Sequence, residues 1–225
     1  MKNKSSLMAD AWGALKQNKA ALFSFVTMSA MVVLVILGPL LSPFAIDQTD
    51  WYQLSAKPSF SSGHIFGTDD LGRDLFVRVM YGGRISLMVG LVATMVSVFI
   101  GVSYGAISGY LGGKTDAIMM RVVDVLYAMP FLFFVILLMV FFGRSILLIF
   151  IAIGAVNWLD IARIVRGQTL NIKGKEFVDA ARAGGVSNTK IVFKHIVPNL
   201  LGLVVVYVAL TVPQVILVES FLSFL

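Results

Sequence analysis

Side chains that could bind a metal ion are few in this sequence. It has two histidines, His64 and His195, which lie far apart in the chain, and no cysteine. Neither histidine belongs to an HExxH pattern or accompanies a cluster of carboxylates. Metal sites in proteins gather three or four such ligands, and a disulfide needs two cysteines. The sequence therefore predicts no metal site and excludes disulfide bonds.

One stretch, SGYLGGKTD at residues 108–116, resembles a phosphate-binding loop. The loop pattern is GxxxxGK[ST]; residues 113–115 fit it, but Ser108 stands where the first glycine belongs. A phosphate loop follows a β-strand, whereas here an apolar run of membrane-spanning length precedes the stretch. We interpret it as a glycine-rich turn, and we expect this chain to bind no nucleotide or other cofactor and to be no enzyme.

The composition places the elements that hold these residues in a membrane. Hydrophobic residues make up 58% of the chain and charged residues 13%, against about 25% charged residues in soluble domains. Crossing the hydrocarbon core takes about 20 apolar residues. The sequence predicts an all-α polytopic membrane helix bundle with five transmembrane helices, at residues 20–41, 85–107, 125–143, 145–162 and 196–218.

The basic residues predict which segments face the cytoplasm. Thirteen of the 18 Lys and Arg residues lie in residues 1–19, 108–124 and 163–195. Cytoplasmic loops carry the excess of basic residues, so we expect a cytoplasmic N-terminal segment and a cytoplasmic insert. The net charge of +6 has the same explanation and does not indicate a nucleic-acid partner. The predicted divisions are a cytoplasmic segment 1–19, a first transmembrane helix 20–41, an external loop 42–84 and a helical core 85–225.

The predicted external loop ends in a stretch with helical periodicity. Apolar residues alternate there with polar ones at helical spacing: Leu71, Leu75, Phe76 and Val79 against Arg73, Asp74 and Arg78. This pattern favours an amphipathic helix lying in the outer membrane interface. A contact surface for an external partner is the alternative.

A glycine pair inside the second predicted span indicates close helix packing. Gly101 and Gly105 form a GxxxG pattern within an apolar run. Small residues four positions apart let two helix backbones approach each other closely. The sequence does not identify the partner helix.

Ionisable residues within the spans are sparse. Asp124, Asp160 and Glu219 lie near span ends, and none is expected at the midplane. Proton- and sodium-coupled carriers need titratable or coordinating groups there, and the sequence shows no candidate for a channel filter. If the protein moves a solute, we expect the energy to come from another chain.

A polar insert at residues 176–199 interrupts the apolar second half of the chain. We expect a helix from Lys175 to Ala183, with Lys175 and Asp179 paired at i, i+4 and the glycines at 184–185 ending it. Ser187 would cap a second helix running to His195, and Pro198 would lie in the first turn of the last span.

The first insert helix would have one face of small or apolar residues: Phe177, Ala180, Ala181 and Gly184. A helix with such a face and basic flanks is suited to dock into a groove of a partner. A helical hairpin packed on the membrane surface explains the same residues. The residues alone leave both interpretations open.

The spacing within the insert resembles the permease subunits of ABC importers. Their cytoplasmic motif is E-A-A-x3-G-x9-I-x-L-P; here Asp179-Ala180-Ala181, Gly185 and Pro198 stand at the matching positions. Asp179 replaces Glu, His195 stands at the Ile position and Val197 at the Leu position. In that family this segment is the coupling helix that docks on the ATPase. The resemblance implies a docking role for Glu176, Asp179, Ala180, Ala181, Gly184, Gly185 and Pro198.

Other segments are similar to the C-type permeases of oligopeptide importers, among them GTDDLGRDLFVRVMYGG, WLDIARIVRGQTL and ESFLSFL. The resemblance implies a type I importer permease fold in the bacterial inner membrane, with residues 85–225 as the permease core. It implies a second permease subunit, two ATPases that bind ATP and magnesium, and an external peptide-binding protein. Family members are longer by a further span, so we expect a C-terminally truncated chain. A related importer of dipeptides or nickel and a non-transporting membrane scaffold are the alternatives.

Overall fold

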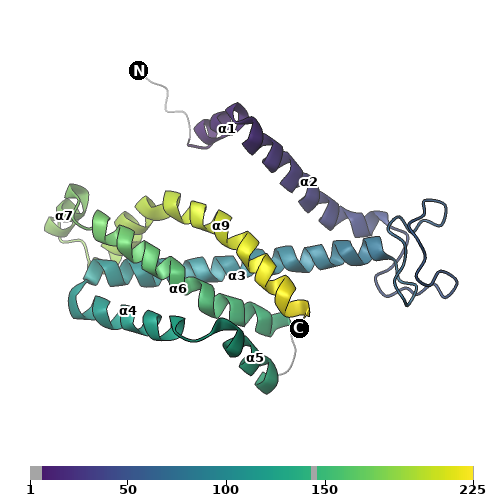
Figure 1. Cartoon of the computed structure of the whole chain (residues 1–225). Helices are drawn as coiled ribbons and strands as arrows, with labels where there is room; N and C mark the ends of the chain where they lie inside the picture. Colours follow the sequence, from purple (N-terminus) through teal and green to yellow (C-terminus); the bar gives the residue numbers. More distant parts are fainter. Residues whose placement is uncertain (1–6, 143–145, 225) are drawn as a thin grey trace. The chain divides into compact units, whose positions relative to one another are not determined.

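The structure is a computed structural model that describes residues 7–142 and 146–224, and the regular structure within these ranges is helical, as predicted. The chain forms two compact units, residues 1–85 and 86–225, and α3 contributes to both. The helices, labelled as in Figure 1, are α1 (Leu7–Gln17), α2 (Lys19–Leu41), α3 (Leu75–Leu111), α4 (Gly113–Tyr127), α5 (Phe131–Phe142), α6 (Ile146–Ile172), α7 (Glu176–Ala183), α8 (Asn188–Ile191), a π-helical turn (Val192–Ile196) and α9 (Val197–Phe224).

Three helical stretches in the described residues are long and apolar enough to cross a membrane. They are α2, α3 and the continuous stretch Asn188–Phe224, of which α9 is the main part. These stretches contain three of the predicted spans, at 20–41, 85–107 and 196–218, and confirm them.

The predicted number of five spans is not confirmed. Residues 125–143 do not form one helix: α4 ends at Tyr127, and α5 begins only after Pro130. A proline disfavours the helical conformation of the residue before it, which explains the break. At about 1.5 Å per residue, α5 is roughly 18 Å long, shorter than the roughly 30 Å hydrocarbon core. The predicted span at 145–162 forms the first part of α6, and residues 143–145 lie outside the described residues.

In the first unit, α2 packs on the first turns of α3 at a glycine and a proline. Gly38 is buried, and a Cβ there would lie 3.0 Å from Cγ of Met80. Pro39 has no N–H, so the Val35 carbonyl lacks its usual helical donor. Arg84 Nε donates to that oxygen at 2.9 Å. The arginine replaces the missing hydrogen bond where an unpaired carbonyl would be costly in a bilayer.

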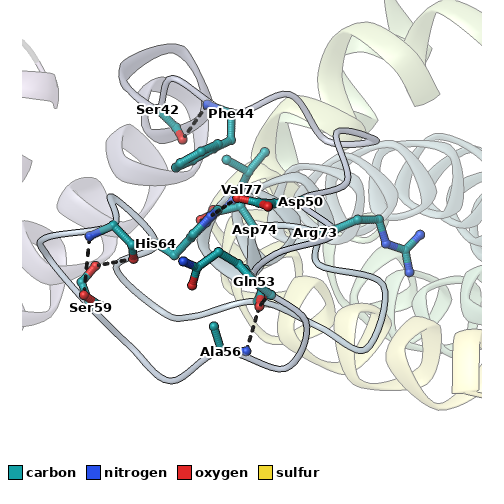
Figure 2. A network of polar contacts seen from close by, with 12 residues as sticks. Ser42, Phe44, Asp50, Gln53, Ala56, Ser59, His64, Arg73, Asp74 and Val77 are labelled. Carbon is teal, nitrogen blue, oxygen red and sulfur yellow. Dashed lines mark hydrogen bonds and ion pairs between the residues drawn. The ribbon is translucent and has the colours of Figure 1, made fainter.

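A polar network folds the loop between α2 and α3 (Figure 2). His64 is 2% exposed, and its Nδ1 lies 2.8 Å from Oδ2 of Asp74. Its ring stacks on Phe44 with the centroids 4.1 Å apart. The other Asp74 oxygen accepts a hydrogen bond from the Val77 N–H at 2.8 Å, which caps the start of α3. His64 therefore supports the loop from inside.

The helix expected from Leu71 onward has other bounds in the structure. α3 begins at Leu75 and continues without interruption to Leu111, so residues 75–84 are not a separate helix. Leu71 stays in the loop because Gly72 turns the chain with a φ of +74°, a conformation that favours glycine. Asp74 is buried and does not face water with Arg73 and Arg78.

In the second unit, α3 packs closely on α6 through a row of glycines. A Cβ at Gly101 would lie 2.7 Å from the Ile161 Cβ, and one at Gly105 would overlap the Ala162 carbonyl oxygen. The close packing predicted for this glycine pair is confirmed, and the partner helix is α6. The row extends one turn further to Gly109.

A buried apolar cluster, here called the hairpin cluster, joins α3, α6, α7, α8 and the start of α9. Its buried members exclude water from the place where these helices meet. They are Val102, Ala106, Tyr110, Ile161, Val165, Val178, Ile191, Val192, Ile196, Leu200 and Val204.

Candidate functional site

The first helix predicted in the insert is present as α7. Lys175 takes an extended N-cap conformation before it. At its end, the Gly185 N–H donates to the Arg182 carbonyl and the Val186 N–H to the Ala181 carbonyl, both at 3.1 Å. This Schellman arrangement requires a left-handed residue, and Gly185 supplies it with a φ of +75°. The predicted end of the helix at the glycine pair is confirmed.

One face of α7 packs on the chain's own core. Val178 is fully buried in the hairpin cluster, and Ala181, one turn later, is half-buried against the same cluster. The sequence predicted one face that carries both Ala180 and Ala181. This prediction is wrong, because Ala181 packs on the core while Ala180 is exposed. Residues three apart lie on the same side of a helix, so the buried Val178 determines which way Ala181 points.

The other face of α7 is exposed. It carries Phe177, whose side chain is 39% exposed, and the small Ala180. Five of the seven residues predicted to dock lie here or at the end of the helix, and all five are exposed: Glu176, Asp179, Ala180, Gly184 and Gly185. Pro198 is also exposed, but it lies in α9.

The ion pair on α7 differs from the one predicted. Asp179 Oδ1 accepts a hydrogen bond from Arg182 at 3.1 Å, and the described contacts of Asp179 include no pair with Lys175. Lys175 is the N-cap in extended conformation, outside the helical turn that an i, i+4 pair requires. Both Asp179 and Arg182 are more than half exposed, and such surface pairs stabilise a fold by only about 0–1 kcal/mol.

The second half of the insert is continuous with the last span. α8 passes through the π-helical turn at 192–196 directly into α9, so the second helix does not end at His195. Ser187 occupies the N-cap position, but its side chain makes no capping bond. A proline ring clashes with the carbonyl four residues earlier. The wider π turn just before Pro198 relieves this clash.

The glycine-rich turn at 108–116 joins two helices and holds them against α6. Gly112 and Gly113 turn the chain with φ of +67° and +57°. Asp116 then lies buried, with both carboxylate oxygens accepting from Arg166 at 2.6 Å. The Arg166 guanidinium holds the pKa of the Asp116 carboxyl below its usual value. A helix precedes the turn, which is unlike the strand that a phosphate loop requires.

Two contacts that Tyr110 makes beside α7 were not predicted. The Tyr110 hydroxyl donates to Asn188 Oδ1 at 2.9 Å. The Arg182 guanidinium lies over the Tyr110 ring, 5.7 Å from its centroid. Periodicity gives no sign of these contacts, because they join segments more than 70 positions apart. The only available signal was the SGYLGG stretch itself, whose glycines indicate a special backbone.

Comparison with protein-family models supports the resemblance found in the motifs. Residues 98–225 match the model described as "Binding-protein-dependent transport system inner membrane component". Residues 6–58 match the model described as "N-terminal TM domain of oligopeptide transport permease C".

Individual relatives match nearly the whole chain. The Oligopeptide transport system permease protein OppC of Escherichia coli strain K12 is 59% identical over 98% of this chain and 73% of its own length. OppC of Haemophilus influenzae is 54% identical over 98% of this chain and 71% of its own length. The Dipeptide transport system permease protein DppC of Bacillus subtilis strain 168 is 44% identical over 98% of this chain and 68% of its own length. With its helical fold and apolar spans, the chain therefore belongs to the family of binding-protein-dependent transport system inner membrane components.

Proposed function

We propose that this chain is a permease subunit of an ATP-driven importer of oligopeptides, and that α7 docks on a cytoplasmic ATPase subunit. The observation that carries the docking role is the division of α7 into two faces. Val178 anchors one face in the hairpin cluster, while Ala180 and Phe177 are presented on the other. A short helix that is packed on the core along one side and carries a small residue and an exposed aromatic residue on the other suits a shallow groove in a partner.

The substrate class is proposed from the names of the relatives and from their identity to this chain. Those named for oligopeptide transport in Escherichia coli and Haemophilus influenzae are 59% and 54% identical. The Bacillus subtilis relative named for dipeptide transport is 44% identical. The higher identity favours oligopeptides, and dipeptides are the second candidate class.

The remaining parts of the importer are proposed from the same family membership. The pathway would need a second permease subunit, and an external binding protein would deliver the peptide. Two cytoplasmic ATPase subunits would bind ATP and magnesium. This chain would hold no cofactor and catalyse no reaction, and its contribution is the lipid-embedded half of the pathway with its docking helix.

Substitution of Ala180 by arginine tests the docking role. A guanidinium on this exposed position leaves the fold of α7 intact, but in a docked complex it would be buried without a partner, which is costly. We expect Ala180→Arg to abolish co-purification of the ATPase from native membranes. Ala14→Arg is the matched control, because Ala14 is an exposed alanine of α1 with the same predicted cytoplasmic location. Undiminished co-purification of the ATPase with Ala180→Arg would remove the docking role and leave the scaffold alternative.

Two substitutions at neighbouring positions are unsuitable for this test. Ala181→Arg would insert a charge into the hairpin cluster, where Ala181 is packed. Gly185→Glu would force a side chain into a left-handed conformation with φ of +75°, which costs about 1 kcal/mol. If either variant lost function, misfolding of α7 would explain the loss as well as failed docking would.

A further inference from the structure

Tyr110 occupies the place where α3, α7 and α8 meet. It is 7% exposed and belongs to the hairpin cluster. Its hydroxyl donates to Asn188 Oδ1 at 2.9 Å, at the first residue of α8. Its ring lies beneath the guanidinium of Arg182, in the last turn of α7. One side chain thus contacts both helices of the insert.

The backbone that carries Tyr110 is itself fixed to α6. A Cβ at the preceding Gly109 would lie 2.8 Å from the Arg166 carbonyl oxygen, so the two helices are in close backbone contact there. Lys173 Nζ donates to the Gly109 carbonyl at 3.0 Å. Ser108 Oγ donates at 2.5 Å to Asp116, which is also held by Arg166. Tyr110 therefore projects from a support that has little freedom to move.

The contacts of Tyr110 extend to the exposed surface of α7. Arg182, which lies over its ring, is also the partner of Asp179 at 3.1 Å. Asp179 is the acidic residue at the start of the motif that resembles the importer signature. A continuous set of side-chain contacts thus runs from the outer face of α7 to the end of α3.

We propose that Tyr110 is a positioning residue that ties the α7–α8 hairpin to the end of α3, so that displacement of the docked hairpin moves the membrane helices with it. The proposal rests on the proposed function of α7. It gives the SGYLGG stretch a role in transmission: the glycines allow the contact with α6, and the tyrosine holds the hairpin. Without the tyrosine contacts, the ATPase would still dock, but its movement would reach the spans less completely.

The test uses the importer purified with its partner subunits and reconstituted into liposomes, with peptide uptake and ATP hydrolysis measured together. Tyr110→Phe removes the hydroxyl and keeps the ring, and Asn188→Ala removes the acceptor. We expect each variant to retain its ATPase subunits and to transport about three- to tenfold less peptide per ATP, the factor that one hydrogen bond supports. The double variant should be no worse than either single variant, since both remove the same bond.

Tyr127→Phe is the matched control. Tyr127 also lies beneath an arginine, Arg163, at 4.3 Å, and its variant should transport as much peptide per ATP as the parent. An unchanged ratio in Tyr110→Phe and Asn188→Ala would overturn the proposal, and so would fully additive losses in the double variant. Release of the ATPase subunits by Tyr110→Phe would also overturn it, because Tyr110 would then be required for docking itself. The docking role of α7 is tested separately. If the Ala180→Arg variant still binds the ATPase, the docking role itself is wrong, whatever the Tyr110 variants show.

Discussion

At the scale of single residues, the glycines of α3 have the most specific role. Gly101, Gly105 and Gly109 recur every four positions and let α3 contact the α6 backbone directly. Dispersion contacts at this distance, rather than the hydrophobic effect, drive association of helices within a bilayer. The same row also places Ser108 and Tyr110 at the level of the α7–α8 hairpin.

Substitution of the middle glycine should therefore destabilise the helix pair. A Cβ at Gly105 would overlap the Ala162 carbonyl oxygen, whereas a Cβ at Gly202 of α9 would meet no atom within 4 Å. We expect Gly105→Ala to destabilise the second unit by about 1–3 kcal/mol, the usual cost of overpacking. Gly202→Ala should be neutral or slightly stabilising, because alanine favours the helix. Thermal unfolding in detergent measures both, and equal melting temperatures would contradict the packing described here.

At the scale of elements, two Asp–Arg pairs join α4 to α6, and they differ mainly in burial. Asp116 and Arg166 form a two-pronged pair whose carboxylate is 11% exposed. Asp124 and Arg163 are joined at 2.8 Å, with the carboxylate 55% exposed. A buried pair that loses one partner leaves a charge in a poorly solvated place, whereas an exposed pair contributes little.

We expect Asp116→Ala to destabilise the second unit by about 2 kcal/mol or more and Asp124→Ala to have little effect. Because folding lowers the pKa of Asp116, its ionised form stabilises the fold. That contribution is complete above the unfolded pKa of about 3.9 and is lost as the pH falls through the lower folded value. Unfolding followed between pH 6 and pH 3 should show a pH-dependent loss of stability in the parent that is smaller in Asp116→Ala. The same pH dependence in both proteins would assign it to other groups.

The elements that were predicted correctly are those in which local pattern and tertiary packing agree. Long apolar runs predicted α2, α3 and α9, and the glycine pair at 184–185 predicted the end of α7. The single helix expected at 125–143 was wrong because Pro130 lies within an otherwise uniform apolar run. Periodicity also could not predict the loop fold around His64, which depends on side-chain hydrogen bonds between distant positions.

The site was predictable in part for the same reason. Spacing identified α7 and its exposed Ala180, because a motif of small residues and glycines is local. The orientation of Ala181 and the contacts of Tyr110 depend on which face of α7 the hairpin cluster buries. That information belongs to the packing of five segments, and no single segment contains it.

At the scale of the whole molecule, function depends on which side of the membrane each segment occupies. Docking on a cytoplasmic ATPase requires residues 163–195 to face the cytoplasm, and an external binding protein requires the loop 42–74 to face outward. The distribution of basic residues predicts this orientation. Both segments offer exposed positions, Ser61 in the loop and Thr189 in α8.

Single cysteines at these two positions test the orientation. The chain has no cysteine of its own, so each variant carries one thiol, and neither Ser61 nor Thr189 is buried. Thr189 is preferable to its neighbour Asn188, which is hydrogen-bonded to Tyr110. In right-side-out membrane vesicles, we expect an impermeant maleimide to label Ser61→Cys at once and Thr189→Cys only after the membrane is permeabilised. If the order were reversed, the insert would face away from the ATPase, and neither the docking of α7 nor the positioning role of Tyr110 could hold.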